Sequence, residues 1–325
     1  MTGEANQLAQ IKTEAAMLNL KPQGRLQKLW REIKKGKYLL IMAAPVIAYY
    51  IIFHYIPMYG VIIAFKSFSP TKGIWGSPFV GFRHFANFFG SYYAFRVIRN
   101  TILINFYHLL FGFPAPIILA LLLNELRSKM FKKAVQTITY LPHFISAIVI
   151  CGIVANFTSS TGLINDVIAA FGGQRESFLL KPEYFRTIYV STGIWQGVGW
   201  GSIIYLAALS GIDPTLYEAT AIDGAGKWRQ FIHVTLPGIA PTIVILLILN
   251  IGKIMSEGFE KVILLYNQNI YETADIISSF VYRRGLIESD YSFSAAVGLF
   301  NSVVNLILIS TANAVSRRVN ETSLW

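Results

Sequence analysis

The sequence predicts an all-α membrane protein with six transmembrane helices, and three observations support this fold class. Hydrophobic residues make up 54% of the chain and charged residues only 14%, against roughly 25% charged residues in an average soluble domain. Six apolar runs approach the length of about 20 residues that a helix needs to cross the hydrocarbon core. Lysine and arginine concentrate in connections that fall on one side of a six-helix topology.

The chain is expected to begin with a cytoplasmic tail, residues 1–37, that carries a helix lying on the membrane surface. Apolar residues recur at helical spacing over residues 24–36, among basic ones: Leu26, Leu29, Trp30 and Ile33. This pattern suits an anionic lipid surface, although a basic run that only fixes the topology accounts for most of the charge. Residues 1–20 are expected to be disordered or weakly helical. No cleavable signal is expected, because the first long apolar run begins near Tyr38.

Six predicted spans form one transmembrane domain, residues 38–318, followed by a short tail at 319–325. The spans lie at 38–65, 98–124, 134–157, 186–210, 236–256 and 293–315. His54 and Pro57 interrupt the first span, and Pro114 and Pro116 interrupt the second. Neighbouring helices can satisfy the backbone groups that such prolines free. All six runs are therefore interpreted as helices.

The basic residues predict that both termini are cytoplasmic. They are dense before the first span, between the second and third spans and after the last, for example at Arg127, Lys129, Arg317 and Arg318. With six spans all of these lie on one side, which the positive-inside rule makes cytoplasmic. The net charge of +11 is therefore attributed to topology, and nucleic-acid binding is rejected. The single cysteine, Cys151, excludes an intrachain disulfide framework.

A polar insert at residues 213–234 separates the fourth and fifth spans and is the most informative part of the sequence. Asp213 and Pro214 predict the start of a helix, since Asp is a good N-cap and proline is tolerated at the first helical position. One face of that helix carries residues at a spacing of four: Tyr217, Ala221 and Ala225. This face is nearly flat, so another surface can approach the backbone closely.

Two glycines predict a turn after this first helix. Gly224 and Gly226 each cost a helix about 1 kcal/mol relative to alanine. The chain is expected to turn there into a second helix over 227–234, and Pro237 marks the entry to the fifth span. From these features alone, docking of a partner protein and a re-entrant linker without a partner remain equal alternatives.

The insert also keeps a fixed spacing: Glu218-Ala219-Thr220, three residues, Gly224, nine residues, Val234, one residue and Leu236-Pro237. This spacing resembles the EAA loop of permease subunits in binding-protein-dependent ABC importers, which has Glu-Ala-Ala, Gly, Ile and Leu-Pro at these places. Thr220 and Val234 are mild departures. The resemblance covers roughly residues 36–318 and implies the six-helix fold of type I ABC importer permeases.

The segments between and within the last two spans resemble the oligosaccharide and polysaccharide branch of that family, of which an alginate importer permease is one case. The matching stretches are Gly258-Phe-Glu-Lys, Tyr271-Glu-Thr-Ala-Asp, Tyr282-Arg and Ala295-Ala-Val-Gly-Leu-Phe300. The resemblance implies that the insert is a coupling helix that seats in a cytoplasmic ATPase. The residues that would make this contact are Tyr217, Glu218, Ala219, Ala221, Asp223, Gly224 and Ala225.

The same resemblance implies an assembly in the bacterial cytoplasmic membrane. Its other members would be a second permease, which favours a heterodimer, two ATPase subunits that bind ATP and Mg²⁺, an extracytoplasmic binding protein, lipid and the saccharide. This chain is expected to hold no cofactor, no metal and no catalytic residue. Consistent with that, Gly224-Ala-Gly-Lys-Trp lacks the leading glycine and the hydroxyl residue of a phosphate-binding loop.

Polar and aromatic residues inside the spans are candidates for a substrate pathway, because polar groups in a membrane tend to face the protein interior. The predicted set is Trp195, Tyr205, Asn250, Lys253, Glu257, Asn301 and Asn305. Each has an alternative explanation: asparagines bond neighbouring helices, aromatics mark the membrane interface, and Lys253 extends to the interface or pairs with Glu257. Basic residues near the outer mouth, Lys261 and Arg283 among them, would suit an acidic saccharide, but nearby glutamates offset that charge.

The fourth span contains glycines at a spacing of four: Gly193, Gly197 and Gly201. Such a stripe permits close helix contact in lipid, either within this subunit or with a second permease.

The predicted function is that of a permease subunit in an ATP-driven importer of oligosaccharides or polysaccharides that works by alternating access. The alternative is a secondary transporter driven by an ion gradient, which would require carboxylates inside the membrane. Apart from residues at the helix ends, the spans contain none. A membrane-embedded enzyme would need a convergent cluster of titratable residues, whereas the five histidines are scattered.

Overall fold

The computed structural model describes residues 36–255 and 258–320, and within these ranges it is built from helices. The β-structure in the described ranges is a single isolated antiparallel β-bridge between Lys66 and Phe79. The predicted all-α class is therefore confirmed for this part of the chain. The predicted surface helix over 24–36, apart from Gly36, and the predictions for residues 1–20 and for the end of the tail, 321–325, lie outside the described residues.

The chain divides into two compact units, Met1–Gly60 and Val61–Trp325. In the first unit α3 (Lys37–Tyr50), the π-helical turn η1 (Ile51–Tyr55) and α4 (Ile56–Met58) follow one another without a gap. The 3-10 segment η2 (Tyr59–Phe65) continues the same helix past the boundary. The resulting helix of 29 residues is apolar enough to cross a membrane and matches the predicted first span.

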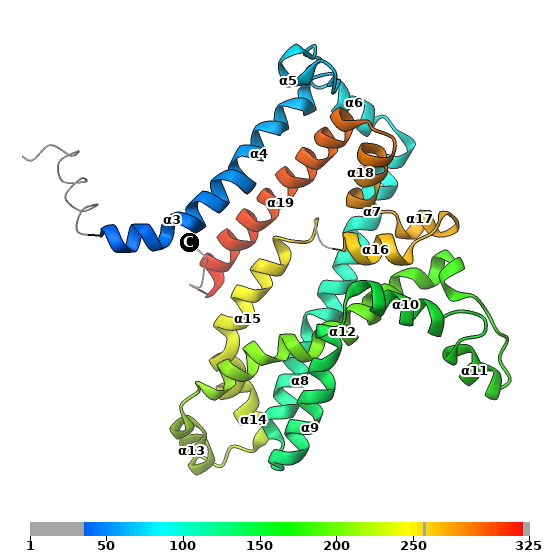
Figure 1. Ribbon diagram of the computed structural model, residues 1–325. Coiled ribbons are helices and arrows are strands. Elements are labelled where there is room, and N and C mark those ends of the chain that lie inside the picture. Colours follow the sequence, from blue (N-terminus) through cyan, green and yellow to red (C-terminus); the bar gives the residue numbers. More distant parts are fainter. Residues whose placement is uncertain (1–35, 256–257, 321–325) are drawn as a thin grey trace, which may run out of the picture. The chain divides into compact units, whose positions relative to one another are not determined.

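The second unit contains the other long helices (Figure 1). The second predicted span consists of α7 (Tyr92–Tyr107), the π-helical turn η3 (His108–Gly112) and α8 (Pro114–Glu125). The fourth is α12 (Pro182–Ser210). The fifth consists of α14 (Lys227–Gln230), the π-helical turn η6 (Phe231–Thr235) and α15 (Leu236–Ile251). The sixth is α19 (Tyr291–Asn320).

Three of the π-helical turns lie directly before a helix that has proline in its first two positions. The prolines are Pro57 after η1, Pro114 after η3 and Pro237 after η6. Proline has no N–H and its ring presses on the carbonyl four residues earlier. Widening the preceding turn relieves that contact, so the helix continues where the sequence suggested an interruption.

The prediction of a single helix over residues 134–157 is wrong. Here α9 (Lys129–Tyr140) runs into the short 3-10 turn η4 (Leu141–Phe144), and α10 (Ala147–Phe157) leaves at an angle of 103°. Pro142 lies in the bend, and Ser146 starts the new helix by accepting a hydrogen bond from the Val149 amide. The third apolar run is therefore a bent pair of helices.

Four described helices are long and apolar enough to cross a membrane, and five if the bent pair counts as one span. The helix α12 has 29 residues, which corresponds to about 43 Å. It is less apolar than the other four because glycine, threonine, serine and tryptophan are frequent in it.

Shorter helices connect these long ones. They are α5 (Gly73–Gly76), α6 (Arg83–Phe89), α11 (Leu163–Ala170), η5 (Phe178–Leu180), α13 (Pro214–Ile222), α16 (Phe259–Leu265), η7 (Gln268–Ile270), α17 (Tyr271–Ala274), α18 (Ile277–Tyr282) and η8 (Arg283–Ile287).

The helix α12 is the centre of the second unit, where it contacts α8, α9, α15 and α17. A Cβ at Gly199 would overlap the backbone of Thr139 in α9, and one at Gly201 would lie 3.0 Å from Pro116. At Gly193 it would lie 3.3 Å from the His108 ring, whereas Gly197 faces open space. Two members of the predicted glycine stripe therefore serve packing within this subunit.

A buried carboxylate fixes the segment between α15 and α19. The side chain of Asp275 is 0% exposed and accepts hydrogen bonds from Arg283 at 2.7 and 3.2 Å. Arg96 of α7 donates to it at 3.4 Å and Ser279 at 2.8 Å. Burial lowers the pKa of Arg283, but the hydrogen bonds and the charge of Asp275 outweigh that effect and raise it above its ordinary value. The ion pair thus anchors α17 and α18 to the start of α7.

Candidate functional site

The insert after α12 folds as the sequence predicts. Asp213 caps α13 by accepting a hydrogen bond from the Thr215 amide at 2.9 Å, and Pro214 is the first helical residue. That backbone hydrogen bond lowers the pKa of Asp213. The carboxylate is the form that accepts it, so the charged cap also interacts favourably with the helix N-terminus.

A glycine turn ends α13 and starts the next helix. Gly224 has φ +73°, a left-handed conformation that glycine adopts without strain. The amides of Gly224 and Ala225 donate to the carbonyls of Ala221 and Thr220 at 3.1 and 2.9 Å, which satisfies the end of the helix. The chain then enters α14 at Lys227, so the predicted turn is confirmed.

One side of α13 is exposed and the other is attached to the helix bundle. Glu218, Ala219 and Ala221 are exposed, and Ile222 is 87% exposed. Tyr217 is half-buried instead. The predicted contact set is therefore divided. Glu218, Ala219, Ala221, Asp223 and Gly224 are exposed, whereas Tyr217 and Ala225 are half-buried.

Tyr217 joins α13 to the start of the fifth span. Its hydroxyl lies 3.0 Å from the Thr235 hydroxyl, in the π-helical turn that precedes α15. Gln230 also donates to the Tyr217 carbonyl at 3.4 Å. An exposed ion pair of 3.4 Å links Lys227 with Glu125 at the end of α8. These contacts attach α13 to the segment that leads into α15.

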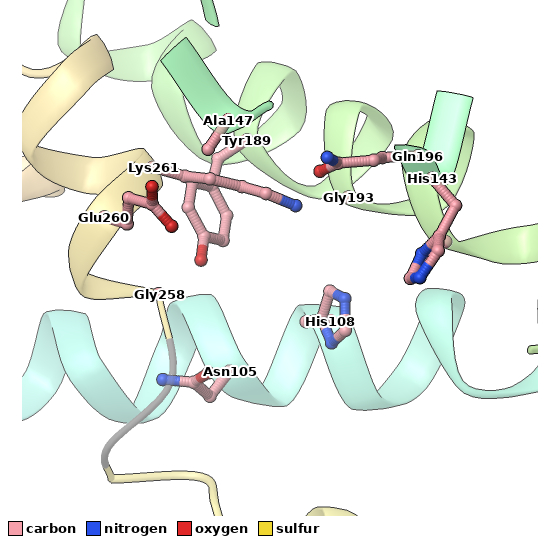
Figure 2. Close-up of a pocket in the computed structure, with 11 residues that line it drawn as sticks. Asn105, His108, His143, Ala147, Tyr189, Gly193, Gln196, Gly258, Glu260 and Lys261 are labelled. Atoms are coloured by element: carbon pink, nitrogen blue, oxygen red, sulfur yellow. The ribbon is translucent and has the colours of Figure 1, made fainter. Parts of the chain in front are cut away.

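A polar cavity of about 480 Å³ lies in the middle of the second unit (Figure 2). It is lined by α7 and η3, by η4 and the start of α10, by α12 and by α16. The polar lining residues are Asn105, His108, His143, Tyr189, Gln196, Glu260 and Lys261. Figure 2 shows the two imidazoles near one another at one end of the cavity, and the Lys261 side chain extending into it.

The backbone explains why these side chains meet. Gly193 leaves room for the His108 ring, and Gly197 adds open space beside it. Gly258 has φ +98° and passes so close to Tyr189 that a Cβ would overlap the tyrosine hydroxyl. His143 stacks on Trp200 with ring centroids 4.6 Å apart and the planes 2° from parallel. The cavity thus depends on glycines that admit polar rings between closely packed helices.

The predicted pathway residues are not all brought together. Tyr205 and Asn250 line a smaller cavity of about 210 Å³, which shares His108, Gly193 and Gly197 with the larger one. Tyr205 is otherwise packed in an apolar cluster with Ala120 and Ile239. Trp195 is 43% exposed and lines neither cavity.

Two predicted pathway residues instead bind the backbone that follows the end of the fifth helix. Asn301 donates to the Met255 carbonyl at 2.9 Å, and Asn305 accepts from the Met255 amide at 3.1 Å. They satisfy backbone groups that are left open after α15 ends at Ile251. Lys253 is exposed in this segment, and Glu257 lies outside the described residues.

Several cavity residues were absent from the predicted pathway: His143, Tyr189, Glu260 and Lys261 among them. His143 and Tyr189 had no signal of their own in the sequence. A usable signal was the helical spacing of Tyr189, Gly193, Gln196 and Gly197, which places a tyrosine, an amide and two glycines on one face of α12.

Comparison with known proteins identifies relatives over most of the chain. A family model described as binding-protein-dependent transport system inner membrane component matches residues 112–321. Protein LplB of Bacillus subtilis is 45% identical, and the match covers 90% of this chain and 92% of that protein. The polygalacturonan/rhamnogalacturonan transport system permease protein YteP of Bacillus subtilis is 43% identical, with 92% and 94% covered.

A solved structure has the same fold. It is a chain from the crystal structure of a bacterial alginate ABC transporter in complex with an alginate pentasaccharide-bound periplasmic protein. The TM-score is 0.85 at 45% identity, and the match covers 91% of this chain and all of that chain.

Proposed function

This chain belongs to the family of binding-protein-dependent transport system inner membrane components, and we propose that it is the permease subunit of an ABC importer for acidic oligosaccharides or polysaccharides. Its relatives include a polygalacturonan/rhamnogalacturonan permease and a chain of an alginate transporter. The alternative of an ion-gradient-driven transporter is not supported by this family membership. As a permease the chain is a non-catalytic component.

The observation that carries the proposed substrate class is the polar cavity between apolar helices. Lys261 supplies a cation for a sugar carboxylate. The amide oxygens of Asn105 and Gln196 can accept from sugar hydroxyls, while their NH2 groups donate to the carbonyls of Thr101 and Ile145. The two imidazoles can donate or accept according to their tautomer. Tyr189 offers an aromatic surface at the cavity wall. The smaller cavity with Tyr205 and Asn250 extends the same polar route.

The proposed mechanism is alternating access driven from the insert. The exposed side of α13, with Glu218, Ala219 and Ala221, contacts a cytoplasmic ATPase, and closure of the ATPase pushes α13. The hydrogen bond between the Tyr217 and Thr235 hydroxyls transmits this push to α15. Since Leu246 and Asn250 of α15 line the smaller cavity, displacement of α15 changes the wall of that cavity.

The proposed assembly has six spans in this chain, with both termini in the cytoplasm. The bent pair α9 and α10 supplies the third span, and α12 the fourth. A second permease, most simply a different chain, completes the pathway. Two ATPase subunits bind ATP and Mg²⁺, and an extracytoplasmic binding protein delivers the saccharide. The chain itself carries no cofactor in this scheme.

The test uses the importer reconstituted in vesicles with its ATPase, its second permease and its binding protein. Glu218→Gln should leave assembly intact but strongly reduce saccharide-stimulated ATP hydrolysis and uptake, because it alters the docking surface. Lys261→Gln should raise the saccharide concentration needed for half-maximal uptake, with basal ATP hydrolysis unchanged. Glu176→Gln is the matched control, because this glutamate pairs with Lys181 away from both sites.

Two results would reject the proposal. Uptake that persists without ATP and follows an ion gradient would exclude an ABC importer. A neutral saccharide of equal length that is taken up as well as the acidic one, both before and after Lys261→Gln, would exclude the assigned substrate class.

A further inference from the structure

A second groove, of about 460 Å³, lies between α7, η3 and α12 and shares no lining residue with the central cavity. Its walls are largely apolar, with Tyr107 and Phe111 on one side and Val190 and Ile194 on the other. Glu183 and Arg186 lie at its other end, near the start of α12. From Glu183 to Ile194 the groove is about 17 Å long, close to half of the about 30 Å hydrocarbon core.

At the charged end Arg186 lines the groove and Arg99 lies beside it, and neither has a carboxylate at ion-pair distance among the described residues. Arg186 donates to the Asn100 side chain at 2.9 Å, and Arg99 donates to the Glu272 carbonyl at 3.2 Å. Asn100 donates to that same carbonyl at 2.8 Å. The two guanidinium groups are therefore joined through neutral groups, the Asn100 side chain and the Glu272 carbonyl.

The hydrogen-bonding capacity of these arginines is also incomplete. The Nε atoms of Arg99 and Arg186 are buried and have no partner in the described residues. The charge of Arg99 disfavours the neighbouring charge of Arg186, and the Glu272 carboxylate offsets this repulsion only in part. A guanidinium fork matches the geometry of a phosphate group particularly well. An anionic group at this end of the groove would therefore stabilise the two arginines.

We propose that this groove binds an aminophospholipid of the outer leaflet. Its phosphate lies against Arg186, its ammonium group lies against Glu183, and an acyl chain follows Phe111 and Ile194 into the membrane. This assignment rests on the proposed topology, in which α12 crosses the membrane with Pro182 at the outer side. A basic group at the headgroup level beside an apolar groove is the arrangement that selects phospholipids.

Glu183 determines which phospholipid headgroup fits the charged end of the groove. It lies three residues before Arg186 and thus on the same side of the helix. Phosphatidylglycerol would bring a phosphate to this carboxylate without any cation. Phosphatidylcholine has a cation that cannot donate a hydrogen bond. Phosphatidylethanolamine matches both charges and supplies N–H donors, so we expect the order ethanolamine, choline, glycerol.

The test measures lipid retained by the assembled importer. The purified complex is incubated with an equimolar mixture of the three phospholipids, and the bound lipid is identified by native mass spectrometry. Phosphatidylethanolamine should be enriched several-fold. Arg186→Gln should abolish the enrichment, and Glu183→Gln should remove the preference over phosphatidylglycerol. Arg175→Gln is the matched control, because this arginine pairs with the exposed Asp166 outside the groove.

Ser191→Trp provides a second variant in case Arg186→Gln does not fold. Ser191 is exposed and lines the groove, so tryptophan should fill it while both arginines stay in place. Equal retention of all three lipids, or unchanged retention in the groove variants, would overturn the proposal. Retention by the isolated subunit but not by the assembled importer would also overturn it, because a protein partner would then cover the groove.

Uptake is measured on the same preparations, which separates this inference from the proposed function. An importer that transports saccharide but retains no phosphatidylethanolamine rejects the lipid site alone. One that retains the lipid selectively but does not transport with its full set of partners supports the site and rejects the function.

Discussion

Replacing the buried Asp275 with asparagine should destabilise this protein more than any comparable surface change. The carboxylate is 0% exposed and accepts two hydrogen bonds from Arg283 and one from Arg96. Asparagine keeps the volume but removes the charge, which leaves two arginine side chains, each only 19% exposed, without their counter-ion. Removing one partner of a buried pair costs about 3–5 kcal/mol.

A matched exposed pair provides the control. Arg175 and Asp166 also lie 2.7 Å apart, but their side chains are 45% and 56% exposed. Exposed pairs contribute about 0–1 kcal/mol, so Asp166→Asn should have almost no effect. The two substitutions make the same chemical change at the same distance and differ in burial, which is the variable under test.

The single cysteine supplies the assay. Cys151 is 2% exposed, so a thiol-reactive fluorophore should label it only as the protein unfolds on heating. At roughly 2–4 °C for each kcal/mol, Asp275→Asn should lower the midpoint by roughly 10 °C. Arg283→Lys keeps the charge but loses the two-pronged contact, so its midpoint should fall between those of Asp275→Asn and Asp166→Asn. A shift for Asp275→Asn no larger than that for Asp166→Asn would refute this reasoning.

Three further predictions follow from the same geometry. Tyr217→Phe removes a hydrogen bond to Thr235 that contributes about 0.5–1.5 kcal/mol, and should speed hydrogen exchange in α13. The Thr235 hydroxyl also donates to the Gln230 carbonyl, so the double change with Thr235→Val should cost less than the sum of the two single changes, and additive effects would contradict the bond. Gly258→Ala should lower the free energy of unfolding by about 1–3 kcal/mol in the thiol-labelling assay, because the backbone is strained and the new Cβ overlaps the Tyr189 hydroxyl. Adding Tyr189→Phe should restore part of this stability, and no restoration would show that the overlap is not the cause. The Thr215 hydrogen bond lowers the pKa of Asp213, so the stability that this cap gives to α13 is fully present above the ordinary pKa of 3.8 and is lost only as pH falls through the lowered pKa. Hydrogen-exchange protection of the first turn of α13, corrected for intrinsic rates, should therefore not change between pH 7 and 5. A loss of protection in that range would contradict the assignment of Asp213 as the cap.

Local patterns in the sequence were sufficient for the membrane class and for the insert. Apolar runs of spanning length depend only on consecutive residues. The start of α13 at Asp213 and Pro214 and the turn at Gly224 depend on residues within one helical turn. These features are local, so the predicted insert agrees with the structure.

Other features required the tertiary structure because they depend on residues far apart in the chain. The bend between α9 and α10 comes directly after the place where α9 packs on α12, so closely that a Cβ at Gly199 would overlap the backbone of Thr139. Asn301 and Asn305 were expected to line a pathway, but a polar group in a membrane is satisfied by the nearest free backbone group, here that of Met255.

The sequence by itself determined that this chain is helical and membrane-embedded, and that it carries a polar insert with a capped helix and a glycine turn, since these properties follow from composition, period and spacing. The tertiary structure alone decided which polar residues share a cavity. His108, His143 and Lys261 come from three separate elements, and only helix packing brings them together. No local pattern contains that information, because the three elements are far apart in the sequence.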